Sequence, residues 1–236
     1  MNPVRIRVMS DEFLVFSLPC GVLQTEFLNK YDFEYAVIIS PSAKADYHIS
    51  TYSKEKKPLT DNYAAAISAA AFLVLKGGLP LYEISFEAPS EIVNVFCTGN
   101  GFFTVLIPNC KQLYTKTIEL LGCGIEYTDV SVKRGVRVVK TKSIENFDKS
   151  MLSAFLLRGE NLPDSVILSS RSDGKLSVII YNKFNPDPLT KLHSFAAAAF
   201  TEKTSYMEKI FFEDNLSYCT RENSTVSVTT KPAVTE

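Results

Sequence analysis

The sequence predicts an α+β protein of two similar lobes, each a mixed and mostly antiparallel sheet wrapped around a central apolar helix. Three observations predict this fold class: an internal repeat, one strongly apolar helical segment in each copy, and alternating strand patterns around each of these segments. A chain of 236 residues is long enough for two modest hydrophobic cores, at roughly 110 residues per lobe.

The repeat consists of three short motifs that occur twice in the same order, about 130 residues apart. The first copy reads Tyr52-Ser53-Lys54, Pro58-Leu59-Thr60 and Tyr63-Ala64-Ala65-Ala66, and the second reads Tyr181-Asn182-Lys183, Pro188-Leu189-Thr190 and Phe195-Ala196-Ala197-Ala198. Each copy runs from an alternating strand through a proline turn into an alanine-rich segment. We therefore predict a first lobe over 1–107 and a second over 108–223, with the strand of 224–236 returning to the first.

The central helix of the first lobe is predicted over 63–76, because this segment is apolar around most of its circumference and must be enclosed on nearly all sides. Gly77-Gly78 provides the C-terminal stop. A short helix is expected over Thr25–Lys30. The strands expected in this lobe are Val4–Val8, Phe13–Ser17, Tyr35–Ser40, Asp46–Tyr52, Tyr82–Glu87, Glu91–Cys97 and Phe102–Leu106.

The second lobe is predicted to repeat this plan, with its central helix over 193–202. Two further helices are expected, one near Gln112–Leu121 and one over Ser143–Arg158. The strands expected here are Arg137–Lys142, Ser165–Ser169, Lys175–Tyr181 and the final Ser224–Thr229.

Composition excludes several function classes. Twenty-five basic and 26 acidic residues give a net charge of -1 without a dense basic cluster, which argues against a nucleic-acid partner. The longest apolar stretch, Tyr63 to Leu75, is too short to span a bilayer. The N-terminal segment alternates like a strand and lacks a signal-peptide core, so we expect a cytoplasmic protein.

Neither a metal nor a cofactor is expected. The five cysteines are scattered without a Cys-x-x-Cys pair, and His48 and His193 are the only histidines, so the sequence contains no zinc-type ligand set. Gly99-Asn100-Gly101 is a hairpin signal and not a phosphate-binding loop.

Several segments resemble the diaminopimelate epimerases and the related phenazine-biosynthesis isomerases, over nearly the whole chain. Ala45 through Tyr52 is similar to the family's "ADYRxRxF" strand. Asp61 through Leu75 corresponds by position to the family's "CGNGxR" motif and first central helix. His193–Ala199 corresponds by position to the family's "CGTGA" motif. Asp187-Pro188-Leu189-Thr190 resembles the "DPxTGS" of the phenazine-type isomerases. The resemblance implies a cofactor-independent isomerase or epimerase fold.

The catalytic motifs depart from the family pattern. Epimerases of this family use two thiols, one from each lobe, but here Asp61 stands at the first position and His193 or Ser194 at the second. The family's glycines at the helix starts are also replaced, and Gly135-Val136-Arg137 stands where an Asn-Pro-His is usual. The resemblance therefore implies a degenerate active site without two-thiol racemase or epimerase chemistry.

The phenazine-type isomerases use a Glu and an Asp instead, and by position Glu34 and Asp187 resemble these residues. His193 could act as a base at the start of the second central helix. These three are the catalytic candidates, and Asp11, Asp61, Lys191 and Ser194 are the substrate-binding candidates. Four of these residues also have a plainer interpretation: a strand-edge carboxylate for Glu34, a helix cap for Asp61, a turn carboxylate for Asp11 and a structural histidine for His193.

Two functions stay open on the sequence. The first is a protein of the isomerase superfamily that acts on, or only binds, a small carboxylate or amino acid in the cleft between the lobes; a homodimer is compatible with it. The alternative is a non-catalytic scaffold or interaction protein whose cleft has filled with alanine and aromatic side chains. Lys191, His193 and Ser194 predict that anion affinity belongs to the second lobe, because Asp61 places a negative charge at the first helix start.

Overall fold

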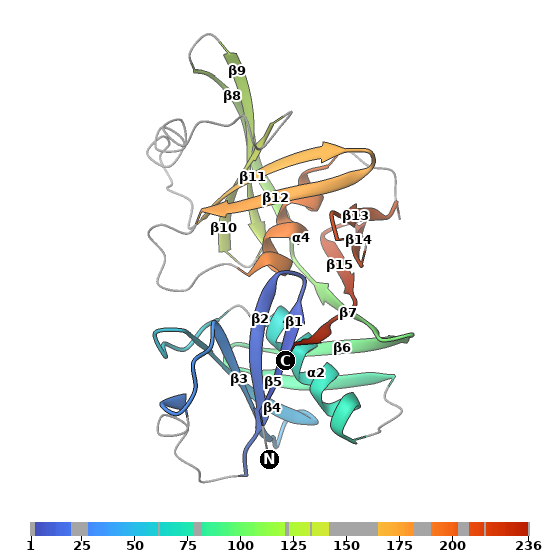
Figure 1. Cartoon of the computed structure of the whole chain (residues 1–236). Helices are drawn as coiled ribbons and strands as arrows, with labels where there is room; N and C mark the ends of the chain where they lie inside the picture. The colour runs from blue at the N-terminus through green and yellow to red at the C-terminus, as the bar shows by residue number, and fades with distance from the viewer. Residues whose placement is uncertain are drawn as a thin grey trace. The chain divides into compact units, whose positions relative to one another are not determined.

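The computed structural model describes residues 3–19, 28–60, 62–77, 82–120, 123–132, 134–141, 165–181, 190–202, 208–214 and 216–235. The chain divides into two compact units (Figure 1). Unit 1 comprises Met1–Leu106 and Thr229–Glu236, and unit 2 comprises Ile107–Val228. The backbone therefore passes from one unit to the other twice, and unit 1 is made from both ends of the chain.

Unit 1 is a mixed sheet in the order β16-β1-β2-β3-β4-β5-β6-β7 with the helix α2 packed on it. Its strands are β1 (Val4–Val8), β2 (Asp11–Ser17), β3 (Tyr35–Pro41), β4 (Tyr47–Ser53), β5 (Glu83–Ala88), β6 (Glu91–Gly99), β7 (Phe102–Ile107) and β16 (Ala233–Thr235), and α2 is Tyr63–Gly77. β2 pairs with β3 in parallel, and so does β4 with β5, while the pairs β1–β2, β3–β4 and β5–β6 are antiparallel.

Unit 2 has the strand order β8-β9-β10-β11-β12-β13-β14-β15 and the helix α4. Its strands are β8 (Lys111–Leu120), β9 (Cys123–Val132), β10 (Arg134–Lys140), β11 (Ser165–Ser172), β12 (Lys175–Tyr181), β13 (Ile210–Phe212), β14 (Ser217–Glu222) and β15 (Thr225–Thr230), and α4 is Lys191–Thr201. The pairs β10–β11 and β12–β13 are parallel, and β9–β10, β11–β12 and β13–β14 are antiparallel.

The two units therefore repeat one pattern of strand directions, with β1–β6 corresponding to β9–β14. In each unit the helix follows the fourth strand of this pattern. The predicted mostly-β α+β class with two apolar helices is confirmed in the described residues.

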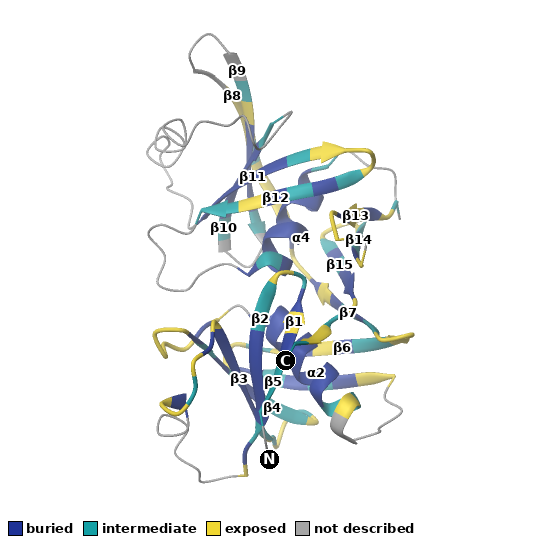
Figure 2. Ribbon diagram, viewed as in Figure 1, coloured by how far each residue is buried: buried dark blue, intermediate teal, exposed yellow. Residues whose placement is uncertain are grey.

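Both helices are enclosed by the strands of their own unit. α2 packs against β1, β2, β3, β4 and β6, and α4 packs against β9, β10, β11, β12 and β14. All residues of α4 after Lys191 are buried, as are Tyr63 through Phe72 of α2 (Figure 2). Alanine occupies most of the tightest positions, because a sheet that wraps around a helix leaves little volume for side chains.

We expect Ala70→Leu and Ala198→Leu each to lower the free energy of unfolding by about 1–3 kcal/mol, since both alanines are fully buried and the added methylenes would overpack a filled interior. Urea denaturation followed by circular dichroism measures the change. Leu75→Ala, at an exposed position near the end of α2, is the matched control and should change stability little. Unchanged stability in both leucine variants would contradict the enclosed-helix arrangement.

The prediction of a helix near Gln112–Leu121 is wrong. Residues 112–120 belong to the strand β8 (Lys111–Leu120), which pairs antiparallel with β9. Tyr114, Thr115 and Thr117 favour a pleated strand, and pairing with a partner along the sheet outweighs local helical spacing. The strands β9, β13 and β14 were not predicted from the sequence. The helix expected over Ser143–Arg158 and residues 25–27 of that expected over Thr25–Lys30 lie outside the described residues.

Candidate functional site

The register of unit 1 brings the start of α2 and two predicted site residues to one end of its sheet. β2 and β3 are parallel with Phe13 opposite Tyr35, so these strands begin at the same level. Tyr35 also faces Ser53 at the end of β4, and the chain turns from there into α2. Asp11, which begins β2, and Glu34, which precedes β3, therefore lie at the end where α2 starts.

Glu34 is exposed, and its carboxylate Oε2 accepts a hydrogen bond of 3.2 Å from the backbone N–H of Glu12. Glu12 itself forms an ion pair of 2.6 Å with Arg5. The hydrogen bond from Arg5 is the main reason that the pKa of Glu12 lies below its usual value. This end of the sheet thus presents several carboxylates on neighbouring strands.

Asn62 directly precedes α2, and two hydrogen bonds hold its side chain in place. Its side-chain Oδ1 accepts a hydrogen bond of 3.3 Å from the Thr51 hydroxyl, and its Nδ2 donates to the Thr60 carbonyl at 2.9 Å. Ala66 N–H donates to the backbone carbonyl of Asn62 at 2.8 Å, so the first helical turn begins directly after this residue. Asp61, predicted as a binding residue, lies outside the described residues.

A tyrosine and a glutamate that were not predicted from the sequence form a hydrogen bond beside this helix start. Tyr63, the first residue of α2, is 3% exposed. Its hydroxyl donates to Glu91 Oε2 at 3.0 Å, and Glu91 begins β6 after the tight turn from β5. The repeat is the sequence signal that could have found this pair. Tyr63 corresponds to Phe195 in the second copy, and Phe195 has no hydroxyl group.

The start of α4 is capped by Thr190, whose Oγ1 accepts a hydrogen bond of 3.4 Å from His193 N–H. The Ser194 hydroxyl donates back to the Lys191 carbonyl at 2.8 Å. Lys191 Nζ donates to the carbonyl of Val178 on β12 and lies 5.5 Å from the centre of the Phe212 ring. His193 is 1% exposed. The structure therefore brings Lys191, His193 and Ser194 together, and Asp187 lies outside the described residues.

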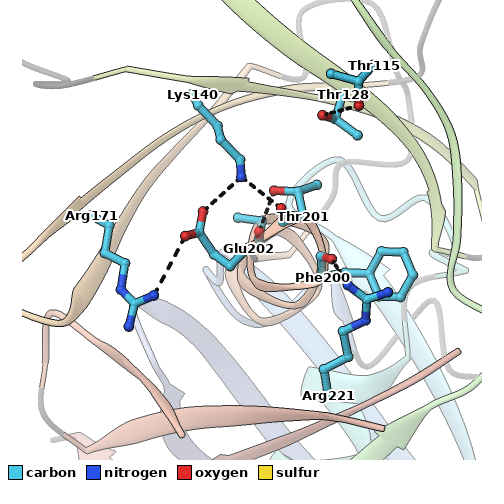
Figure 3. Close-up of polar contacts among 9 residues, drawn as sticks. Thr115, Thr128, Lys140, Arg171, Phe200, Thr201, Glu202 and Arg221 are labelled. Atoms are coloured by element: carbon cyan, nitrogen blue, oxygen red, sulfur yellow. Dashed lines mark hydrogen bonds and ion pairs between the residues drawn. The ribbon is translucent and has the colours of Figure 1, made fainter. Parts of the chain in front are cut away.

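Three basic side chains, those of Lys140, Arg171 and Arg221, lie at the carboxyl end of α4 (Figure 3). Lys140 Nζ donates to the carbonyl of Thr201 at 2.8 Å and lies 3.3 Å from a carboxylate oxygen of Glu202. Arg171 approaches the same carboxylate at 3.8 Å, and Arg221 donates to the Phe200 carbonyl at 2.9 Å. Cations at the carboxyl end complement the helix dipole, and the amino end keeps its partial positive charge.

Arg137, at the place of the family's Asn-Pro-His, is a fully buried ion-pair partner with 0% exposure. Its Nε and Nη2 donate to the two carboxylate oxygens of Asp129 at 2.7 and 2.8 Å, and Nη2 also donates to the Tyr114 hydroxyl at 3.2 Å. The guanidinium stacks 4.4 Å from the centre of the Tyr127 ring. The hydrogen bond to Asp129, together with burial, raises the pKa of Tyr114.

This ion pair is structural. Side chains alternate along β10, so Arg137 lies on the face opposite Lys140, which reaches the end of α4. The Arg137–Asp129 pair thus lies on the sheet face turned away from the helix.

None of the five cysteines belongs to α2 or α4, or to the residues directly before these helices. Burial raises the pKa of the Cys110 thiol to about 11, and complete burial also raises that of Cys219 on β14. Cys97 lies on β6, half-buried. A thiol with a raised pKa is protonated near neutral pH and is a poor proton acceptor.

Within the described ranges, no group of three or more His, Cys, Asp or Glu side chains is arranged to hold a metal ion. No helix in the same part of the chain is long and apolar enough to cross a membrane.

No family model matches the chain, and no curated protein matches it either. Solved structures do. A phenazine biosynthesis protein of the PhzF family from Enterococcus faecalis is similar with a TM-score of 0.73 at 12% identity, over 99% of this chain and 96% of that one. The chain has the diaminopimelate epimerase-like fold. The resemblance noted in the sequence is confirmed at the level of the fold.

Other proteins with the diaminopimelate epimerase-like fold match over nearly the whole chain. A hydroxyproline epimerase from Agrobacterium vitis, solved with bound trans-4-hydroxy-L-proline, has a TM-score of 0.63 at 9% identity, covering 99% of this chain and 88% of that one. A probable proline racemase from Agrobacterium radiobacter, solved with bound carbonate, has a TM-score of 0.61 at 10% identity, covering 99% and 90%. At these identities the similarity is one of fold.

Proposed function

We propose that the protein is a divergent member of the isomerase superfamily that binds a small carboxylate or amino acid and transfers a proton on it without two-thiol chemistry. The observation that carries the proposal is the gathering of Asp11 and Glu34 at the end of the unit 1 sheet where α2 begins. Carboxylates positioned beside a helix start can replace thiols as proton acceptors, because both groups serve as general bases when ionised.

Two observations support a small carboxylate or amino acid as the ligand. One solved protein of this fold holds trans-4-hydroxy-L-proline and another holds carbonate. In unit 2, the amino end of α4 carries a partial positive charge, and Lys191 lies in its first turn. We keep Lys191 and Ser194 as candidate contacts for the ligand carboxylate, and Asp11 and Asp61 as further binding candidates.

In the proposed reaction a carboxylate takes the proton from the α-carbon of the ligand and a second group returns one. Glu34, Asp187 and His193 are the candidates by resemblance. The raised pKa values of Cys110 and Cys219 support chemistry without these thiols. No cofactor is needed for this step, because the electron pair left on the α-carbon is delocalised into the ligand's carboxylate.

The alternative is a non-catalytic scaffold or interaction protein, and one observation favours it. Asn62, Thr190 and Ser194 are buried and hydrogen-bonded to groups of their own unit. Helix starts whose side chains are satisfied internally present fewer donors to a ligand than the glycine-rich starts of the epimerases.

Exchange of the α-proton in deuterated buffer tests the proposal. The protein is incubated with a panel of L-amino acids, including proline and trans-4-hydroxyproline, and with simple 2-substituted carboxylic acids, and the loss of the α-proton signal is followed by proton NMR. We expect exchange with at least one compound class. We also expect alkylation with iodoacetamide to leave most of the exchange intact, since none of the five cysteines stands at either helix start in the sequence.

Binding without exchange is measured from backbone amide shifts in parallel samples of nitrogen-15-labelled protein in ordinary water buffer. A small carboxylate is expected to shift the amides of His193–Ala196 more than those of Tyr63–Ala66. Complete loss of exchange on alkylation, with the circular dichroism spectrum preserved, would contradict chemistry without thiols. Absence of both exchange and binding across the panel would leave the scaffold function.

A further inference from the structure

We infer that Glu91 is the proton-accepting carboxylate of unit 1 and that Tyr63 positions it. This inference rests on the proposed function and names its base, in place of Glu34. It begins from the hydrogen bond of 3.0 Å that the Tyr63 hydroxyl donates to Glu91 Oε2 at the start of α2.

The backbone holds both partners in place. Tyr63 is the first residue of α2, where side chains are tilted back toward the amino end of the helix. Glu91 is the first residue of β6, directly after the tight turn from β5, and it lies opposite Ala88 in the β5–β6 ladder. Two regular elements with short connections therefore fix the pair, and a rigid support of this kind is what a proton-transfer group requires.

The repeat shows that the hydroxyl of Tyr63 is not needed for packing. The equivalent position in the second copy is Phe195, which is fully buried and packs edge-on against Phe212 with ring centres 5.0 Å apart. An aromatic ring thus fills this position in both units. Only in unit 1 does the ring carry a hydroxyl, and there it is directed at a carboxylate.

Glu91 is better placed for acid–base chemistry than Glu34. Glu34 is exposed and its carboxylate accepts a hydrogen bond from a backbone N–H of the neighbouring strand. Glu91 is half-buried and contacts a phenol that is 3% exposed.

The step is balanced without another reactant. The Cα–H bond of the ligand breaks, its electron pair stays on the ligand as an enolate, and the proton moves to the Glu91 carboxylate. Return of a proton from Glu91 re-forms the Cα–H bond, and in deuterated buffer a deuteron returns after exchange with solvent. Tyr63 keeps its own proton throughout, and its hydrogen bond fixes the orientation of the carboxylate.

The test measures α-proton exchange in Glu91→Gln, Tyr63→Phe and Glu34→Gln, with the compound that the wild-type protein exchanges. Glu91→Gln is expected to lower the exchange rate by about 100-fold or more. Tyr63→Phe removes the hydrogen bond that orients the Glu91 carboxylate. It should lower the exchange rate at saturating ligand by about 10-fold and leave KM for the ligand unchanged, because the base is misplaced while the contacts that bind the ligand remain.

Two variants serve as matched controls. Tyr82→Phe removes a hydroxyl from a side chain that is 86% exposed, and Glu83→Gln neutralises an exposed carboxylate at the far end of the β5–β6 ladder. Both should keep the wild-type exchange rate and KM. Thermal melting of every variant verifies that it is folded, and Tyr63→Phe should fold because Phe195 occupies the same position in unit 2.

The outcomes separate this inference from the proposed function. If the wild type exchanges the ligand while Glu91→Gln keeps its rate, or if only Glu34→Gln loses it, the inference is overturned and the proposed function stands. An unchanged exchange rate at saturating ligand in folded Tyr63→Phe overturns the positioning role of the tyrosine. If the wild type neither exchanges nor binds any compound of the panel, both fail together.

Discussion

Replacing Asp129 with alanine is expected to lower the free energy of unfolding by about 3–5 kcal/mol, because it leaves the guanidinium of Arg137 buried without its carboxylate. Arg137 is fully buried and donates to both oxygens of Asp129, so no solvent is available to replace the lost partner. Urea denaturation monitored by circular dichroism measures the effect through the shift in midpoint at constant slope.

The matched control is the double variant Asp129→Leu with Arg137→Met. Removing both charges and keeping most of the volume should restore most of the stability, since replacing a buried ion pair with apolar side chains is often nearly neutral. Tyr114→Phe, which removes one further acceptor of Arg137, should lie between the wild type and Asp129→Ala. A loss below about 1 kcal/mol in the single variant would show that the pair is hydrated in solution.

Phe195→Ala is expected to be comparably destabilising, by about 3–5 kcal/mol. Phe195 lies within α4, is fully buried and contacts Phe212 on β13, so its removal opens a cavity between the central helix and the sheet. The strands around α4 cannot collapse onto the space without moving the helix that they enclose. Thermal and urea unfolding both report the change.

Phe211→Ala is the control, because Phe211 is the neighbour of Phe212 on β13 but is 40% exposed. It should cost well under half as much, since less apolar surface returns to water. Equal losses in the two variants would mean that β13 as a whole, and not the contact of Phe195 with the strand, determines the stability of this region.

The repeat and the two apolar helices could be predicted from sequence because both are local properties. Enclosure of residues 63–72 follows from apolar residues on all faces of this part of α2. β8 and β9 could not be predicted in the same way. The spacing of Gln112–Leu121 is compatible with a helix, and only pairing with Cys123–Val132 makes it a strand. Short strands such as β13 have too few residues to show a period.

The candidate site was predictable only in part for the same reason. Glu34 and Asp11 could be placed at strand starts, because strand starts have local signals. The contact between Tyr63 and Glu91 joins residues 28 positions apart, and it depends on how the β5–β6 ladder is arranged beside α2. The Arg137–Asp129 pair likewise depends on register, since these residues face each other only through the β9–β10 ladder.

The pairing of β16 with β1 also constrains how unit 1 is completed during protein synthesis. Arg5, Ile6 and Arg7 of β1 pair with Thr235, Val234 and Ala233 of β16, which the ribosome makes long after β1. At about 5–20 residues per second, β1 waits about 10–45 s for this partner while the residues between them are translated. During that interval one edge of the nascent sheet is open, and it offers unpaired backbone groups to other chains. The two arginines of β1 supply charge on that edge, which opposes intermolecular pairing until β16 is made.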